Sequence, residues 1–330
     1  MSKRKQRRHK ARPASKRVSI SPDWNSEPSG PLFHYTSAAG LIGIVKDQVL
    51  WATHANYLND TAELQIISRL LTPQISNEFR QIVPRLVDLN AFKPGLLQNF
   101  GESLYDTEAI NVCRAVMRTI EKVSPMYVVS FCMHDAGSEE SEHGLLSQWR
   151  GCGLGGFAIE FDPVELDKLT QLENAQRSVQ MIGTRKVAYR DHEAKAELKR
   201  FEGLGRATLG NAFRAAAPTL AARPDVAEII GNQPLEDFVR PFLKAVPFLK
   251  TPRFESEKEY RLVASATRPK NVSEDTRAPI NVHFREGASG AIIPYIKLFE
   301  TLGTKLPIRK IIVGPHRDQE NQLQRGAIVT

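Results

Sequence analysis

Two glutamates late in the chain form the clearest chemical pattern of the sequence. Glu257 and Glu259 are two residues apart, and Arg261 follows at the same spacing. In a β-strand, residues at this spacing point to one face, so we expect the three charged groups to form a row. Neighbouring carboxylates repel each other unless a positive group lies between them. The pattern therefore predicts either a site that handles a cation-like species or an exposed row of charges on an edge strand.

A histidine near the expected start of the folded chain is the second candidate. His34 lies in segment 32–35, which is expected to form a short strand, and Thr36 precedes a helix expected over 38–46. Alternation along the strand places His34 and Tyr35 on opposite faces. An imidazole in this position can hydrogen-bond a ligand hydroxyl or amide. The alternative is a structural histidine whose hydrogen bonds are satisfied inside the fold.

Two polar segments complete the candidate site. Asn59 and Asp60 belong to a loop that is rich in amides and acids, and Trp149 and Arg150 lie in a short helix expected over 145–150. A tryptophan beside an arginine can stack on and clamp an aromatic ligand that bears phosphate. The alternative is a packed tryptophan next to an arginine in a surface ion pair.

Other common sites are not indicated by the spacing of residues. The glycines at 151–156 follow an expected helix and precede an expected strand, the reverse of the order in a dinucleotide-binding loop. His134 and His143 are nine residues apart in an acidic loop, a spacing that does not predict zinc, and we expect both to be exposed. The three cysteines form no paired framework. No metal site is predicted.

The positive charge of the chain is concentrated at its start. The formal net charge is +8, and residues 3–17 contain nine lysines and arginines and no acid, so the remainder is close to neutral. This basic tail lacks apolar periodicity and is predicted to be disordered. It either adds sequence-independent affinity for nucleic acid or serves as a solubilising extension.

Length and composition indicate one folded domain after this tail. The chain has 330 residues, of which 41% are hydrophobic and 25% charged, which excludes a wholly disordered or fibrous chain. No apolar run is long enough for a membrane-spanning helix, and no signal segment follows the basic start. We predict a tail and linker over 1–28, a single domain over 29–330, and a cytoplasmic protein without a membrane partner.

Short strands between helical stretches predict an α+β domain with a small, split and strongly bent mixed sheet. Strands are expected at 32–35, 49–52, 127–132, 157–162, 259–263 and 308–313. A helix is expected from Glu63 to Leu71. Helical insertions are expected at about 73–122, interrupted by Pro84 and Pro94, and at about 186–249.

Taken in order, these segments resemble a mostly bacterial family catalogued as domain of unknown function 2971. The resemblance covers about residues 32–315 and rests on HYTS at 34–37, YLND at 57–60, SQWRG at 147–151, EKEYR at 257–261 and IIVGP at 311–315. Cys152 departs from the pattern, because the family usually has an aromatic residue there. The family itself implies no agreed activity.

A more distant resemblance is to the ADP-ribosyltransferase fold, which uses NAD as its substrate. It implies that His34 holds the ribose and amide end of NAD and that Glu259 stabilises the ribose cation. Glu257 then resembles the first acid of the pair in transferases that modify side chains, and Ser130 takes the place on a middle strand beside the nicotinamide. The candidate NAD-binding set also includes Tyr35, Thr36, Asn59, Asp60, Trp149, Arg150 and Arg261.

The sequence is compatible with three functions. The first is an NAD-dependent ADP-ribosyltransferase that modifies a nucleic acid or a protein in phage defence, as a toxin or in stress. The second is a non-catalytic regulatory module that uses the same polar residues to bind a nucleotide or a partner. The third is a metal-dependent nuclease with Asp60, Glu63, Glu257 and Glu259, in which the basic tail holds the substrate; it ranks last because these acids have no two-metal spacing.

Overall fold

The computed structural model describes residues 28–58, 62–92, 101–151, 156–266, 277–287 and 290–315. The basic tail at 3–17 and the predicted site residues Asn59 and Asp60 lie outside these ranges, as do Pro94 and Cys152. Glu63 lies in a described helix, but its side chain is outside the description.

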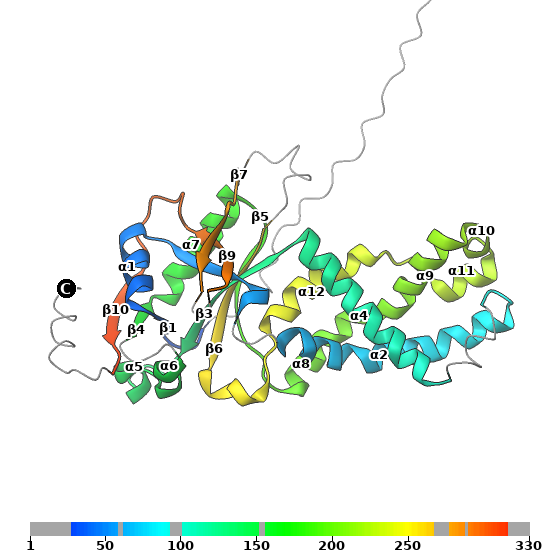
Figure 1. Ribbon diagram of the computed structural model, residues 1–330, viewed down its shortest axis with the longest axis horizontal. Coiled ribbons are helices and arrows are strands. Elements are labelled where there is room, and N and C mark those ends of the chain that lie inside the picture. The colour runs from blue at the N-terminus through cyan, green and yellow to red at the C-terminus, as the bar shows by residue number, and fades with distance from the viewer. Residues whose placement is uncertain are drawn as a thin grey trace, which may run out of the picture.

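A largely antiparallel sheet occupies one half of the molecule and a helical lobe the other (Figure 1). The strand order is β10-β4-β1-β3-β2-β9-β8, and β6, β5 and β7 attach beside β3. The bounds are β1 (Leu32–Thr36), β2 (Leu50–His54), β3 (Met126–Met133), β4 (Phe157–Phe161), β5 (Arg177–Lys186), β6 (Glu259–Ala266), β7 (Ala278–Pro279), β8 (Val282–Glu286), β9 (Ile292–Leu298) and β10 (Ile308–Val313). All the predicted strands are present. The sheet is larger than predicted, because β5, β7, β8 and β9 join it.

The sheet is split at β3, because β1 and β2 share one edge of that strand. β1 pairs only with Cys132 and Met133 at the end of β3. β2 pairs only with Tyr127 and Val128 at its beginning. The other edge of β3 pairs with β6 along its length. On the edge that faces β1 and β2, none of the described strands pairs with β3 between these two short ladders, around Ser130.

Helices cover the two faces of the sheet in different ways. Apolar residues of α1 (Ala38–Asp47) and α7 (Pro163–Gln176) pack on one face, where they share a core with Val129, Phe131 and Leu262. On the other face, the short helices α5 (Glu139–His143) and α6 (Leu146–Gly151) lie next to β1, and Trp149 packs on Phe33.

The two predicted helical insertions pack together as one lobe (Figure 1). Its α-helices are α2 (Ala62–Asp88), α4 (Ser103–Val123), α8 (Asp191–Leu198), α9 (Leu204–Ala216), α10 (Pro218–Ala221), α11 (Pro224–Ile230) and α12 (Val239–Ala245). The shorter 3₁₀ segments are η2 (Ala55–Tyr57), η3 (Lys199–Phe201), η4 (Leu235–Phe238), η5 (Val246–Phe248) and η6 (Pro252–Glu257). The apolar core of the lobe also includes Val128 and Val263, so the lobe is joined to the sheet through β3 and β6.

The expected interruption at Pro84 is wrong. α2 continues through Pro73 and Pro84, and the helix expected at 63–71 is its first part. Proline removes one backbone hydrogen bond from a helix. Ile75 and Phe79 before Pro84, and Leu86 after it, are buried against other helices, and this packing keeps α2 continuous. No described helix is long and apolar enough to cross a membrane.

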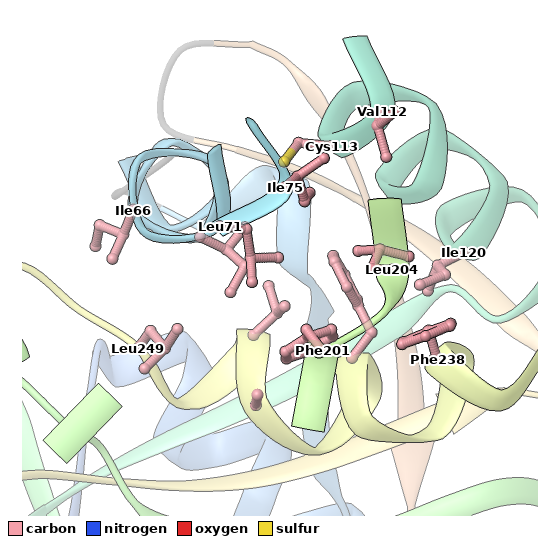
Figure 2. Close-up of a cluster of buried hydrophobic side chains, with 14 of the residues drawn as sticks. Ile66, Leu71, Ile75, Val112, Cys113, Ile120, Phe201, Leu204, Phe238 and Leu249 are labelled. Atoms are coloured by element: carbon pink, nitrogen blue, oxygen red, sulfur yellow. The ribbon is translucent and has the colours of Figure 1, made fainter. Parts of the chain in front are cut away.

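Replacing Ile75 with alanine should destabilise the helical lobe strongly. Figure 2 shows Ile75 among side chains of the lobe's core, and its side chain is inaccessible to solvent. We expect a loss of about 2–5 kcal/mol in the free energy of unfolding, measured by urea titration. Ile42 is 64% exposed on α1, so the same substitution there should cost at most about 0.5 kcal/mol. Equal losses in the two variants would contradict this assignment of the core.

Candidate functional site

A buried charge cluster, formed by Lys250, Glu257, Glu259 and Arg261, lies where β6 begins. Both carboxylate oxygens of Glu259 accept hydrogen bonds from the guanidinium of Arg261, at 2.8 and 3.1 Å. Nζ of Lys250 lies 3.1 Å from Oε2 of Glu259. The side chains of Arg261 and Glu259 are only 2% and 5% exposed. Glu259 is therefore a buried carboxylate whose two oxygens are both occupied by positive groups.

Glu257 reaches this cluster by a different route from the one predicted. It is the last residue of η6, and Lys258 after it has a positive φ of 46°, so β6 begins only at Glu259. The prediction that both acids share a strand face is therefore wrong. They are joined through Lys250, whose Nζ lies 2.7 Å from Oε2 of Glu257. The expected position of Arg261 on the same strand face as Glu259 is confirmed, and there the two side chains pair.

The charges of the cluster stabilise one another against the cost of burial. Burial alone would raise the pKa of Glu259, but the charges of Arg261 and Lys250, with a smaller contribution from the nearby side chain of Ser130, lower it to about 2. Burial opposes the charge of Lys250 as well, yet Glu259 and Glu257 raise its pKa. The backbone N–H of Glu259 donates to the hydroxyl of Tyr189. At neutral pH Glu259, Lys250 and Arg261 are therefore all ionised.

Lys250 is the cluster residue that reasoning from the sequence missed. It follows the apolar segment 245–249, which is buried in the lobe. Its backbone N–H donates to the carbonyl of Ala188, and its Nζ lies 4.5 Å from the centre of the Phe254 ring. A lysine directly after a buried apolar run, shortly before two acids, is a signal that identifies it as a buried ion-pair partner.

His34 lies at the split, where the edge of β3 that faces β1 and β2 has no strand partner. Its Nδ1 donates to the carbonyl oxygen of Ser130 at 2.9 Å, so the imidazole takes the place of a missing backbone hydrogen bond. Burial lowers the pKa of His34, although the Ser130 carbonyl acts in the opposite direction. The neutral ring donates through Nδ1 and offers Nε2 as an acceptor. No described residue hydrogen-bonds Nε2.

Ser130 connects His34 to the buried charge cluster. Its carbonyl accepts from His34, and its side chain lies near Glu259 and helps to lower the pKa of that carboxylate. Register shows which faces are involved: Phe33 and Glu259 both pair with Cys132 and share one face, so His34, next to Phe33, points to the other. The structure thus brings His34 and Glu259 to the same residue of β3 from opposite sides of the sheet.

The predicted residues Tyr35 and Trp149 meet in an aromatic cluster with Phe33 and His134. The rings of Tyr35 and Trp149 are 4.8 Å apart and nearly perpendicular, and those of Phe33 and His134 are 4.6 Å apart. The Tyr35 hydroxyl lies 3.0 Å from Nε2 of His134. The expectation that His134 is exposed is therefore wrong, because contacts with both aromatic residues of β1 bury it.

Trp149 and Arg150 lie side by side in sequence but point to different surroundings. Trp149 is buried, and its indole N–H donates to the carbonyl of His143 at 3.0 Å. Arg150 is exposed, and Thr36 is half-buried at the end of β1. Tight packing on Trp149 requires glycine at position 144, where a Cβ atom would lie 2.3 Å from the indole ring. The arrangement of Trp149 corresponds to the packing alternative considered for the sequence.

Comparisons with known proteins do not identify a family or a function for this chain. The chain matches no protein-family model, no curated protein and no solved structure. The resemblances noted in the sequence therefore remain predictions. Within the described residues, no group of three or more histidine, cysteine, aspartate and glutamate side chains is placed to hold a metal ion. Asp60 and the side chain of Glu63 lie outside that description.

Replacing Glu259 with glutamine should change how stability depends on pH. The pKa of Glu259 falls from its ordinary value of 4.5 to about 2 on folding, so ionised Glu259 stabilises the fold above about pH 5. This stabilisation, about 3 kcal/mol, is lost as the pH falls towards 2. E259Q should be less stable by about 3–5 kcal/mol at neutral pH, because it leaves Arg261 and Lys250 buried without their carboxylate.

Urea unfolding followed by circular dichroism at neutral pH and at about pH 3 measures both effects. Glu255 is the matched control, because its carboxylate pairs with Arg190 on the surface and its side chain is 45% exposed. E255Q should keep the pH dependence of the unmodified chain. A steep loss of stability in acid that persists unchanged in E259Q would contradict the pairing of Glu259.

Proposed function

We propose that the protein is an NAD-dependent ADP-ribosyltransferase whose reaction centre lies beside Ser130, at the split in the sheet. The observation that carries this proposal is that His34, bonded to the Ser130 carbonyl, and Glu259, near the Ser130 side chain, reach the same residue of β3 from opposite faces, so NAD has to extend through the split between them. These are the residues that the resemblance to the ADP-ribosyltransferase fold assigns to the NAD anchor, the middle strand and the catalytic acid. The proposed acceptor is a nucleic acid or a protein, in bacterial defence, toxin action or stress.

The chemistry of transfer suits a carboxylate such as Glu259. The bond between the anomeric ribose carbon and the nicotinamide nitrogen breaks, and its electron pair leaves with the nicotinamide, which becomes neutral. Positive charge then develops on the ribose. A carboxylate with a pKa of about 2 is ionised at any physiological pH and stabilises that charge electrostatically.

The acceptor completes the reaction. Its nucleophilic oxygen or nitrogen forms the new bond to the anomeric carbon and releases a proton. Glu257 takes that proton, because it lies on the solvent side of the cluster, with its side chain 21% exposed against 5% for Glu259. The neutral ring of His34 accepts a hydrogen bond through Nε2 from a ribose hydroxyl or from the nicotinamide amide.

Binding of NAD must loosen one contact of Glu259, because Arg261 and Lys250 occupy both of its carboxylate oxygens. Lys250 is the partner that can leave, since Glu257 offers its Nζ a second and shorter contact of 2.7 Å. Arg261 stays in place, because its guanidinium also donates to the carbonyl of Pro247 at 2.6 Å. A shift of Lys250 towards Glu257 then leaves Oε2 of Glu259 with only its hydrogen bond from Arg261, so that this oxygen can also face the ribose.

A second candidate function is a non-catalytic module that binds a nucleotide or a partner. The full pairing of Glu259 favours it, because a carboxylate held by two positive groups can serve as a structural anchor alone. In such a module, Glu257 takes no part in a reaction, and its charge affects ligand affinity only modestly.

Replacing Glu257 with glutamine separates the two functions. In a transferase, E257Q should lower ADP-ribose transfer from radiolabelled NAD by about 10²–10⁴-fold, because the proton acceptor is lost, while NAD affinity stays within a few-fold. Transfer to nucleic acid and protein, nicotinamide release and NAD binding by calorimetry are measured together. E255Q, which alters a surface acid two residues before Glu257, should leave all of them unchanged.

The outcomes are distinct. Failure of the folded protein to bind NAD would remove the transferase proposal. NAD binding without transfer or nicotinamide release, unaltered in E257Q, would support the non-catalytic module instead. His34→Phe keeps an aromatic ring but removes both ring nitrogens, and in either NAD-binding function it should weaken NAD binding by about tenfold.

A further inference from the structure

A second group of polar and aromatic side chains lies on β2, β9 and β8. It consists of Trp51, Thr53, Tyr295, His283 and Arg285, which we call the β2–β8 face. Thr53 pairs in register with Tyr295, and Tyr295 with His283, so these residues point to the same side of the sheet. Trp51, two residues before Thr53, and Arg285, two residues after His283, share that side but lie at opposite ends of the face.

The aromatic rings of this face form a row. The rings of Trp51 and Tyr295 are 5.0 Å apart with 36° between their planes, and those of His283 and Tyr295 are 5.5 Å apart with 33° between theirs. Gly43 of α1 allows the helix to pass close to the indole of Trp51, since a Cβ atom there would lie 3.3 Å from the ring. The side chains are thus held in place before any ligand binds.

Two hydrogen-bond donors on this face are buried and unsatisfied. One N–H group of Arg285 donates to the hydroxyl of Thr53 at 3.1 Å, but its Nε–H has no partner. The indole N–H of Trp51 is likewise buried without a partner. Among the described residues, no carboxylate pairs with Arg285. An unsatisfied buried donor costs about 1–3 kcal/mol, so two on one face need a physical explanation.

The chemistry of these donors defines what would satisfy them. Arginine offers a planar fork of N–H groups that matches the oxygens of a phosphoryl group, and its charge strengthens each hydrogen bond. Lys297, the register partner of Trp51, adds a second positive charge nearby, and it lies 3.8 Å from Glu300. A positive group of donors with unused N–H bonds requires an anion that is rich in acceptors.

We propose that the β2–β8 face binds a phosphoryl group, with Arg285 and the indole N–H of Trp51 as its donors. The inference does not depend on the transferase proposal, because it uses none of the residues of the buried charge cluster. It does place the site next to the split. Thr53 pairs with Val128, so Trp51, two residues before it, is level with Ser130 across the gap. The phosphoryl group comes either from free phosphate or from a nucleotide.

The indole N–H signal of Trp51 in heteronuclear NMR reports directly on this site. The chain has three tryptophans, Trp24, Trp51 and Trp149, and the signal that disappears in Trp51→Phe is that of Trp51. Inorganic phosphate, ADP and NAD are titrated separately at constant ionic strength. We expect the Trp51 signal to move and saturate. Movement with phosphate alone identifies a simple anion site, and movement only with ADP or NAD identifies a nucleotide site.

Two variants test the donors separately. Arg285→Gln should weaken binding by at least about tenfold, because a charge-assisted pair of hydrogen bonds is lost. Trp51→Phe keeps an aromatic ring and removes one neutral donor, so calorimetry should show affinity reduced by about three- to tenfold. Arg69→Gln is the matched control, since the side chain of Arg69 is 59% exposed and pairs with Asp191 on the surface; its affinity should not change.

The proposal is overturned if the Trp51 signal stays in place with all three ligands while circular dichroism shows a folded protein. It is also overturned if Arg285→Gln and Trp51→Phe both bind like the unmodified chain, which would indicate an adventitious ion only. E259Q is the arm that separates this proposal from the previous one. It should bind phosphate like the unmodified chain whether or not it transfers ADP-ribose.

Discussion

The ionic contact of Glu259 with Arg261 and Lys250 is the interaction on which the candidate site depends. Its members come from separate parts of the chain. Arg261 and Glu259 lie on β6, whereas Lys250 follows η5 of the helical lobe. Arg261 also donates to the carbonyl of Pro247, so the cluster fastens the lobe to the sheet. Removing a charge from water is costly, and the cluster is stable only because each buried charge has an opposite partner.

The pairing of Glu259 with Arg261 and Lys250 also limits which reactions the buried charge cluster can support. It keeps Glu259 ionised, which suits the stabilisation of a cation, and it also occupies both carboxylate oxygens. Lys250 resolves this conflict, because it is held between two acids and can move towards Glu257 without losing an ionic partner. Reactivity at Glu259 is thus coupled to the position of one lysine, and through it to the packing of the helical lobe against the sheet.

The split in the sheet has a separate physical consequence. Where β1 and β2 part, backbone groups at the edge of β3 lose their strand partners and must be satisfied in another way. The imidazole of His34 does this for the carbonyl of Ser130. On the β2 side, the indole of Trp51 has a buried N–H without a partner. The gap therefore places two polar side chains, those of His34 and Trp51, where a regular sheet would have hydrogen bonds between backbones of neighbouring strands.

Local spacing in the sequence was sufficient for β1, β2, β3, β4, β6 and β10, for the two helical insertions and for the shared strand face of Glu259 and Arg261, because these depend on periodicities of a few residues. It misplaced Glu257, since the left-handed backbone at Lys258 cannot be inferred from two acids at strand spacing. Local spacing could not predict contacts between segments that are distant in the chain. The burial of His134 against β1, the meeting of Lys250 with Glu259 and the place of Ser130 between β1 and β6 arise only when separate strands pair. The sequence thus identified residues that could take part in a site, but tertiary structure alone determined which of them share an environment. The reason is that burial and charge pairing depend on neighbours that are far away in the chain.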